Sequence, residues 1–445
     1  MLRLLFIFFF GGIMIFSTNT ATAEKKIFPY QSEKYVLDNG LTAYIIPTPA
    51  EGIVSYYTVV RTGSRDEFEQ GHSGFAHFFE HMMFRGTKKY PGHVYDSITV
   101  VMGANANAYT TDDYTCFHIT GTKDNLEKVI ELESDRFQNL FYSEDAFKTE
   151  SGAVYGEYRK GKSNPFFVAY EKMMNTAFAR HTYKHTVIGF EADIAAMPTM
   201  YEYSINFFKR YYRPENVIII VTGDIEYGNV KEMIKKYYAN WERGYVTPKI
   251  PTEPEQKSPQ EASVKYPGKT LPILAIAYKS LAYAPESVEY LASYIIGDLL
   301  FGKTSDIYKK LLIKEQKVQV IGTEFSKNRD PNLNSIYIML NSKDDIDYVR
   351  SEINKLIEKY RNELIDEKKL EDLKMNLKYS FLMSLDTPEK VAGGLAREVA
   401  ITGTINTVDT FFETLEKVKP EDIKNALNKY FAPERKTTIT LLGGK

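Results

Sequence analysis

The sequence predicts an α+β protein made of two homologous domains, each with an antiparallel-rich sheet packed against long helices. An internal repeat is the first observation: residues 210–224 (RYYRPENVIIIVTGD) match residues 429–443 (KYFAPERKTTITLLG) as a helix end, a proline turn and an apolar strand. Strand-like and helix-like segments are also grouped more than strictly alternating, which indicates α+β. Between the repeats, residues 244–267 are rich in Pro, Glu, Lys and Gln, the composition of an extended linker.

Length and charge limit the classes of protein to consider. A chain of 445 residues is too long for one ordinary core, and 43% hydrophobic with 26% charged content is typical of a soluble globular protein. We expect a signal peptide over 1–23, a first domain over 30–243, the linker over 244–267 and a second domain over 268–445. The net charge of −2, without a basic tract, argues against nucleic acid as a partner.

The first 23 residues have the pattern of an export signal. Arg3 supplies a positive charge, residues 4–16 form an apolar run, and residues 21–23 (ATA) have the small-x-small form of a cleavage site. The run is shorter than the roughly twenty residues that a bilayer span needs, so we expect cleavage and no stable membrane span afterwards. The mature chain is therefore expected in a bacterial periplasm or secreted, and its single cysteine, Cys116, rules out an intrachain disulfide.

Hydrophobic periodicity places the main elements of the first half. A β-hairpin is expected over 34–46 because Asn39-Gly40 supplies the positive φ values of a tight turn. Further elements are expected at 53–62 (strand), 74–84 (a helix too apolar to be exposed), 109–120 (strand), 124–140 (helix) and from 143 onward (helix with Ser143 as its N-cap). The second half repeats this order, with strands expected at 273–278, 318–326 and 335–340 and helices at 288–301, 345–361 and 368–385.

Three side chains in the helix expected at 74–84 form a metal-ligand pattern. His77, Glu80 and His81 are spaced i, i+3, i+4, so they share one helix face. Two neutral imidazoles on adjacent turns can hold one zinc ion, and the carboxylate between them can take a proton from water at the open coordination position. His-x-x-Glu-His is the inverted zincin motif. The alternative is a helix with two ordinary histidines, one of them a hydrogen-bonded core residue.

A hydrolytic zinc site needs a third protein ligand that leaves one position for water. The helix that starts near Ser143 carries Glu150 and Glu157, two turns apart and hence on one face. Glu157 is the candidate ligand, with Glu150 beside it as a hydrogen-bonding or proton-handling group. Two glutamates on a helix are also typical of a solvated surface, and the residues alone leave that alternative open.

Small and amide residues at 103–108 lead into the strand expected at 109–120. Small side chains let another backbone approach, and a sheet edge near a zinc site suits an extended peptide. A simple hairpin with asparagine-rich turn chemistry explains the same residues equally well. The last histidine of the chain is His185, so the second half cannot hold an equivalent zinc site. We therefore expect one half to do the chemistry and the other to close over it.

The sequence resembles the pitrilysin/insulinase family of zinc peptidases over nearly the whole mature chain, and is most similar to its mitochondrial-processing-peptidase branch. The resemblance rests on residues 74–87 (GFAHFFEHMMFRGT), 107–110 (NAYT) followed by Tyr114-Thr115, Glu150 with Glu157, 181–183 (HTY) and 187–189 (VIG). It implies a Zn²⁺ cofactor held by His77, His81 and Glu157, with Glu80 as general base and Glu150 as a supporting acid. It also implies that Asn107 and Ala108 bind the substrate backbone, and that two such two-domain units form a clamshell.

One segment departs from the family pattern. Family members that act alone supply an Arg and a Tyr to the substrate carbonyl, the Arg from a segment like Gly-x-x-Ser-Arg-Leu-Tyr. Here residues 302–308 read GKTSDIY, with Asp306 in place of the arginine, and Val320 falls where the tyrosine is expected. Each hydrogen-bond donor to the oxyanion typically stabilises the transition state by about 2.7–4 kcal/mol. This difference predicts that the chain is the zinc-bearing subunit of a heterodimer whose homologous partner supplies the Arg/Tyr pair. The alternative is that Tyr308, Lys309 or Lys310 replaces the missing donors.

The predicted function is therefore that of a zinc metalloendopeptidase acting on unfolded or short peptides. Two alternatives come from other classes: a non-catalytic subunit, and a zinc-dependent peptide-binding protein that does not hydrolyse. The intact motif argues against a non-catalytic subunit, which needs no ligands, whereas the missing Arg/Tyr pair leaves that alternative open. A binding protein would form stable complexes with intact peptide.

Overall fold

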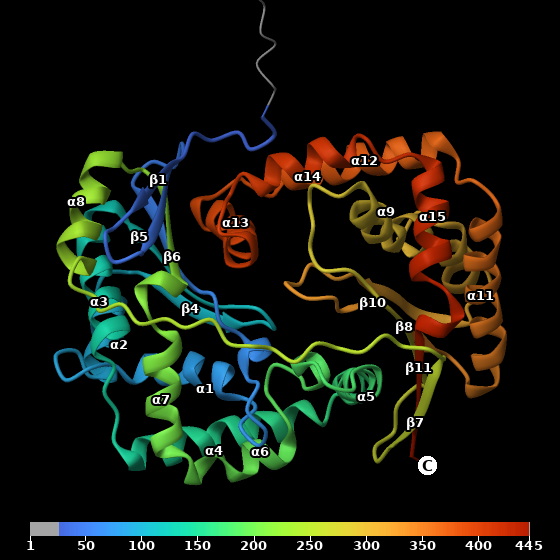
Figure 1. Ribbon diagram of the computed structural model, residues 1–445, viewed down its shortest axis with the longest axis horizontal. Coiled ribbons are helices and arrows are strands. Elements are labelled where there is room, and N and C mark those ends of the chain that lie inside the picture. The colour runs from blue at the N-terminus through green and yellow to red at the C-terminus, as the bar shows by residue number, and fades with distance from the viewer. Residues whose placement is uncertain (1–25, 445) are drawn as a thin grey trace, which may run out of the picture.

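The computed structural model describes residues 26–444, and the signal peptide predicted over 1–23 lies outside the described residues. Two sheets lie side by side, each accompanied by its own set of helices (Figure 1). The fold is α+β, as the sequence predicted. Within the described part of the chain, no helix combines the length and the apolar composition that a membrane span requires.

The first sheet has six strands in the order β1-β2-β6-β3-β5-β4, in which only β2 and β6 pair in parallel. Its strands are β1 (Glu33–Val36), β2 (Thr42–Pro47), β3 (Ile53–Val60), β4 (Asn105–Thr110), β5 (Thr115–Thr122) and β6 (Val217–Gly223). Every residue of β6 is buried, because this β-branched strand lies inside the sheet with elements packed on both faces.

The second sheet has five strands in the order β7-β11-β8-β10-β9, with β7 and β11 parallel. Its strands are β7 (Gln260–Tyr266), β8 (Ile273–Lys279), β9 (Val318–Glu324), β10 (Leu333–Leu340) and β11 (Lys436–Gly443). The predicted repeat is visible here, since β6 and β11 each follow a proline-initiated 3₁₀ turn, at Pro214–Asn216 and Pro433–Arg435. The end of the segment expected as a linker forms strand β7 and joins the sheet.

The first half contains the two long helices that were predicted at 124–140 and from residue 143 onward. Its helices are α1 (Phe75–Met82), α2 (Gly92–Val101), α3 (Leu126–Asn139), α4 (Glu144–Gly161), α5 (Pro165–Ala177), α6 (Glu191–Ala196), α7 (Tyr201–Tyr211) and α8 (Tyr227–Tyr238). Ser143 caps α4 as predicted, because its Oγ accepts a hydrogen bond from the Ala146 backbone N–H at 3.2 Å.

The second half contains the three helices predicted at 288–301, 345–361 and 368–385, in that order, together with further helices. Its helices are α9 (Val288–Ile296), α10 (Asp306–Tyr308), α11 (Ile346–Asn362), α12 (Glu367–Met383), α13 (Pro388–Thr402), α14 (Thr407–Leu415) and α15 (Pro420–Tyr430). The helix expected over 288–301 is α-helical only to Ile296 and continues as a π-helical turn over 297–301.

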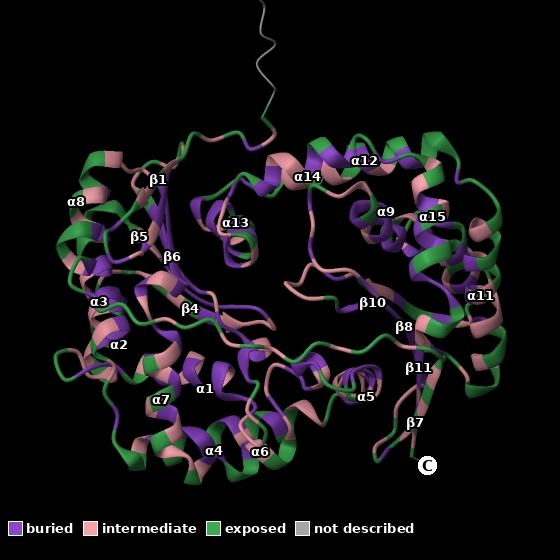
Figure 2. Ribbon diagram, viewed as in Figure 1, coloured by how far each residue is buried: buried purple, intermediate pink, exposed green. Residues whose placement is uncertain are grey.

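The two halves exchange a helix. Helix α5 packs on strands β7, β8 and β11 of the second sheet, whereas α13 packs on β3 and β6 of the first (Figure 1). Met173 and Ala177 of α5 share a core cluster with Ala275 of β8, and α13 is largely buried (Figure 2). The fit of α13 is close, because a Cβ on Gly393 would lie 3.4 Å from the Tyr57 hydroxyl. Apolar burial of both helices therefore binds the halves together.

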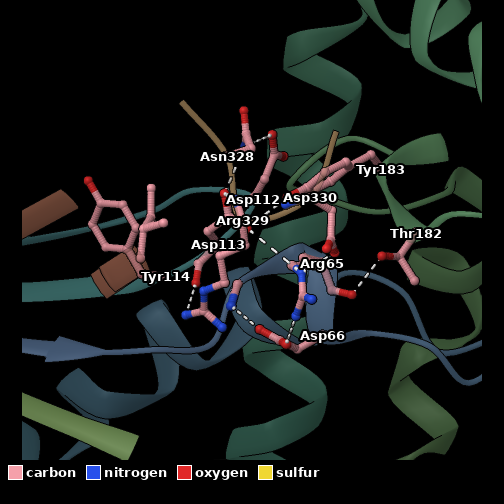
Figure 3. A network of polar contacts seen from close by, with 12 residues as sticks. Arg65, Asp66, Asp112, Asp113, Tyr114, Thr182, Tyr183, Asn328, Arg329 and Asp330 are labelled. Carbon is pink, nitrogen blue, oxygen red and sulfur yellow. Dashed lines mark hydrogen bonds and ion pairs between the residues drawn. The ribbon is translucent and has the colours of Figure 1, made fainter. Parts of the chain in front are cut away.

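A polar network joins the halves where the β4–β5 turn meets the second sheet (Figure 3). Arg329 donates from Nη2 to the carbonyl oxygens of Arg61 and Asp113, both at 2.8 Å. Arg65 donates from Nε to Asp330 Oδ2 at 2.6 Å, and His181 Nε2 lies 2.9 Å from the same oxygen. Residues of the first half thus provide most of the hydrogen-bond partners of Arg329 and Asp330, two consecutive residues of the second half.

Two local predictions need correction. The predicted hairpin is present, but its loop spans 37–41 and only Gly40 has positive φ (+92°). Asn39 serves another purpose, since its side-chain amide donates to the Tyr238 and Trp241 carbonyls. The single strand expected over 109–120 was also wrong. Thr111 Oγ1 accepts hydrogen bonds from the backbone N–H groups of residues 113 and 114, which reverses the chain, and the asparagine-rich segment is itself strand β4.

Candidate metal centre

Helix α1 is fixed by packing on one side and by a carboxylate at its start. Its apolar residues are fully buried, namely Phe75, Phe78, Phe79 and Met82. Glu67 accepts hydrogen bonds from the backbone N–H groups of Gly74 and Ala76 at 2.7 and 2.6 Å, which satisfies donors that a helix N-terminus leaves free. The side chains of His77 and His81 meet Glu157 and Glu150 of α4, whereas Glu80 meets Thr110 of β4.

The structure brings His77, His81 and Glu157 together. Glu157 Oε2 lies 3.7 Å from His77 Nε2 and 3.3 Å from His81 Nε2, and one ligand atom from each residue falls within 4.8 Å of the others. A tetrahedral ion with ligands at about 2.0–2.1 Å has ligand-to-ligand edges of about 3.3–3.4 Å. The spacing of these three atoms therefore fits a zinc ion, with a fourth position left over.

Glu150 contacts the site from a position two turns before Glu157 on α4. Its Oε1 lies 3.0 Å from His81 Nδ1, and its Oε2 accepts hydrogen bonds from Arg85. A proton on His81 Nδ1, donated to Glu150, leaves the Nε2 lone pair directed at the site. Despite burial, the hydrogen bonds from His81 and Arg85 hold the pKa of Glu150 below its usual value.

The other histidine is held neutral by its surroundings. Burial, with a further contribution from His81, lowers the pKa of His77 to about 4. An uncharged imidazole is the form that binds a metal ion, so His77 is ready to bind at neutral pH.

Glu80 shares this face and is held by a residue from the first sheet. Thr110, at the end of β4, donates from Oγ1 to Glu80 Oε2 at 2.6 Å. Burial raises the pKa of Glu80 despite this hydrogen bond, because the low-polarity environment disfavours its charged form. A carboxylate of raised pKa, oriented through one oxygen, is suited to accept and return a proton through the other.

Strand β4 is the last strand of the first sheet, and it lies next to α1. Asn107 is exposed on it and pairs with His118 of β5, whereas the Ala108 side chain is buried. Asn107 Oδ1 accepts a hydrogen bond from the Ala108 N–H at 2.9 Å. Both predicted substrate-binding residues thus lie on a sheet edge that an extended peptide can join.

The two positions that depart from the family pattern lie in the second half. Asp306 begins α10 and forms an ion pair with Lys369 at 3.1 Å. Val320 lies on β9, the edge strand of the second sheet, with 40% of its surface exposed. Neither side chain can act as a cationic or phenolic hydrogen-bond donor.

Sequence reasoning gave no role to Thr110 or Arg85, although both lie inside the segments that carry the family resemblance. A helix period identifies side chains that share a face, but it does not show which strand or turn a carboxylate on that face contacts. The available signal was position: Arg85 comes four residues after His81, and Thr110 ends the NAYT segment.

Comparison with protein families assigns both halves of the chain. Residues 45–190 match the model described as insulinase (peptidase family M16), and residues 201–377 match the model described as the peptidase M16 inactive domain. The zinc protease PqqE of Helicobacter pylori is 29% identical, over 92% of this chain and 92% of that protein. The mitochondrial-processing peptidase subunit beta of Neurospora crassa is 23% identical, over 90% of this chain and 85% of that protein.

Solved structures show the same architecture. A protease from Helicobacter pylori has a TM-score of 0.87 and 28% identity, over 93% of this chain and 99% of that chain. The periplasmic protease PqqL of Escherichia coli has a TM-score of 0.77 at 18% identity, over 93% of this chain but 48% of that chain. This chain therefore has the fold of about half of that longer protein.

Proposed function

The chain belongs to the insulinase family of zinc peptidases, peptidase family M16, and from that premise we propose that it is a zinc-dependent endopeptidase acting on unfolded or short peptides. The observation that carries the proposal is the convergence of His77, His81 and Glu157 beside Glu80. Metal-dependent peptide hydrolysis needs metal ligands and a carboxylate that can transfer a proton, placed beside a surface that can hold a peptide.

The proposed ligands are His77 Nε2, His81 Nε2 and a carboxylate oxygen of Glu157. When bound there, zinc would act as a Lewis acid, polarising the scissile carbonyl and making water a better nucleophile. A proton on His81 Nδ1, donated to Glu150, would leave His81 Nε2 free to bind the ion, and burial favours the neutral form of His77.

Glu80 is the proposed general base. Thr110 occupies its Oε2, so Oε1 takes the proton from the attacking water and then gives it to the nitrogen of the leaving amine. The raised pKa of this carboxyl group favours the first transfer, because a carboxylate of raised pKa is a stronger base.

The substrate is proposed to lie along β4. An extended peptide added to this edge would hydrogen-bond to the backbone near Asn107 and Ala108 and would displace the internal bond between them. Binding through backbone hydrogen bonds depends on few side chains of the substrate, so it suits unfolded or short peptides of varied sequence.

A homologous partner subunit is proposed to supply an Arg/Tyr pair to the substrate carbonyl. Asp306 and Val320 stand where this chain would otherwise provide those donors. The similarity to a protein named as a subunit, and the coverage of only half of PqqL, support a site completed by a second two-domain unit.

The proposed location is outside the cytoplasm, in a bacterial periplasm or secreted. The export pattern of residues 1–23 supports this, and PqqL is described as periplasmic. Fractionation of cells followed by N-terminal sequencing should find a mature chain that starts near Glu24; a cytoplasmic chain with an intact leader would contradict the proposal.

The experiment is cleavage of an unstructured quenched peptide by residues 24–445, alone and mixed with a homologue that carries the Arg/Tyr pair, each with and without a chelator. Chelator-sensitive cleavage only in the mixture supports both the peptidase and the split site. Cleavage by this chain alone supports the peptidase and contradicts the need for a partner. A zinc-loaded chain that is inactive in both cases would overturn the peptidase proposal in favour of a zinc-dependent binding protein or a non-catalytic subunit.

A further inference from the structure

Arg85 lies directly after the helix that carries the metal motif, in a 3₁₀ turn at Met83–Arg85. Its guanidinium reaches α4 and donates from Nε to Glu150 Oε2 at 2.6 Å, and also from Nη2 to the same oxygen. Half of the Arg85 side chain is exposed, whereas only 5% of the Glu150 side chain is. The guanidinium therefore covers a nearly buried carboxylate from the solvent side.

The two oxygens of Glu150 are divided between two partners. Oε1 faces His81 Nδ1 at 3.0 Å, and Oε2 is held by Arg85. A buried carboxylate is costly unless it is paired, so its partners decide how it is oriented. Of the two, only Arg85 carries a permanent positive charge, because a neutral His81 is needed for metal binding.

The backbone at Arg85 is fixed by the residue that follows. Gly86 has a φ of +83°, and a Cβ at this position would lie 2.2 Å from the Tyr90 carbonyl oxygen. The Gly86 carbonyl also accepts a hydrogen bond from the Phe141 N–H at 3.2 Å. Since only glycine fits this turn, the chain leaves α1 in one direction and presents Arg85 to α4.

We propose that Arg85 is a positioning residue for the metal ion: it anchors Glu150 through Oε2, so that Oε1 receives the Nδ1 proton of His81 and His81 Nε2 stays directed at Glu157. The inference rests on the proposed function, because it concerns the zinc site. Removing an outer partner of a metal-bound histidine typically costs 10–100-fold in metal affinity. Lysine is an incomplete substitute, since it lacks the fixed fork through which two arginine N–H groups reach one oxygen.

The test compares wild type, Arg85→Gln, Arg85→Lys and the control Lys89→Gln. Lys89 follows four residues later but pairs with Glu131 at 2.8 Å, so its substitution removes the same charge without touching Glu150. The zinc dissociation constant is measured by competition with a chromophoric chelator. Because Arg85 acts through Glu150, we expect a rise near the lower end of that range, about 10-fold, for Arg85→Gln, a smaller rise for Arg85→Lys and none for Lys89→Gln.

A second measurement is made on the wild-type chain and so does not depend on whether an Arg85 variant folds. In zinc-free protein with nitrogen-15-labelled histidine, at a pH where the His81 ring is neutral, that ring should carry its proton on Nδ1; its signal is assigned by its loss in His81→Gln. Wild-type zinc affinity in Arg85→Gln, or a predominantly Nε2-protonated His81 ring, would overturn the inference while leaving the zinc peptidase intact. A wild-type chain that binds no zinc would overturn the proposed function as well.

Discussion

His81 Nδ1 lies 3.0 Å from Glu150 Oε1, although the two residues are 69 positions apart in the chain. The contact joins the helix that carries the inverted motif to the helix that carries Glu157. It exists because α1 packs against α4 through its buried face, as in the contact of Phe78 with Phe147 at 5.0 Å between ring centroids. The geometry of the candidate site is therefore a consequence of how two helices pack.

Glu80→Gln is expected to remove hydrolysis while zinc still binds. The amide keeps the shape of the carboxyl group but cannot take a proton, and general-base contributions are on the order of 10²–10⁴ in rate. Peptide cleavage and zinc content are measured on the preparation that shows chelator-sensitive activity. Glu144→Gln, at an exposed position of α4, is the control and should behave as wild type. Unchanged turnover in Glu80→Gln would show that Glu80 is not the general base.

Zinc should stabilise the chain against unfolding, and Glu157→Gln should weaken that effect. A ligand present at 100 times its dissociation constant adds about 2.7 kcal/mol when it binds only the folded state. Thermal melts with zinc and with a chelator measure the shift. Glu144→Gln again serves as control, because it alters the same helix away from the site. An equal zinc shift in Glu157→Gln and wild type would show that Glu157 is not a ligand.

Asp330 should contribute stability that is lost in acid. Burial opposes its ionisation, but hydrogen bonds from His181 and Arg65 outweigh this and hold the pKa of Asp330 at about 2. A carboxyl group whose folded pKa is depressed stabilises the fold above its ordinary pKa near 4, and that contribution disappears as the pH falls toward 2.

Asp330→Asn is therefore expected to lower the free energy of unfolding by about 2 kcal/mol at pH 7, with the difference shrinking below pH 4. Urea unfolding of both proteins at several pH values measures this. Asp344→Asn, at an exposed site, should change little. A difference between wild type and Asp330→Asn that stays constant down to pH 2.5 or so would contradict the linkage.

Arg136 and Glu133 form a buried ion pair in the core of the first half. Arg136 Nη2 lies 2.7 Å from Glu133 Oε2, with side-chain exposures of 2% and 0%. Arg136→Met should destabilise the fold by about 3–5 kcal/mol, because it leaves a buried carboxylate without its cation.

Adding Glu133→Gln to that variant should restore part of the loss, since the uncompensated charge is then gone. Chemical denaturation of the single and double variants measures both effects. A double variant no more stable than Arg136→Met alone would mean that the lost contacts with the aromatic rings near Arg136, and not the uncompensated charge, cause the destabilisation.

Local pattern was sufficient for much of the architecture. The spacing of His77, Glu80 and His81 places them on one helix face because the α-helix has 3.6 residues per turn. Apolar runs located strands such as β6 and β8, and the repeat around Pro214 and Pro433 indicated two similar halves. Each of these signals depends on residues that are close in sequence or on a period that backbone geometry imposes.

Other features could not be obtained in this way. The periodicity of α5 and α13 shows that each has an apolar face, but it does not say which sheet that face covers, and each helix covers the sheet of the opposite half. The break at 111–114 was missed because a threonine side chain, and not a glycine or proline, makes the turn.

By itself, the sequence determined the motif, its family and the internal repeat, because helix period, strand alternation and turn chemistry act over a few residues. Only the tertiary structure decided that Thr110 orients Glu80 and that Arg85 holds Glu150 against His81. Those contacts join residues from different elements, and their geometry follows from the packing of buried apolar faces, which a one-dimensional pattern does not encode.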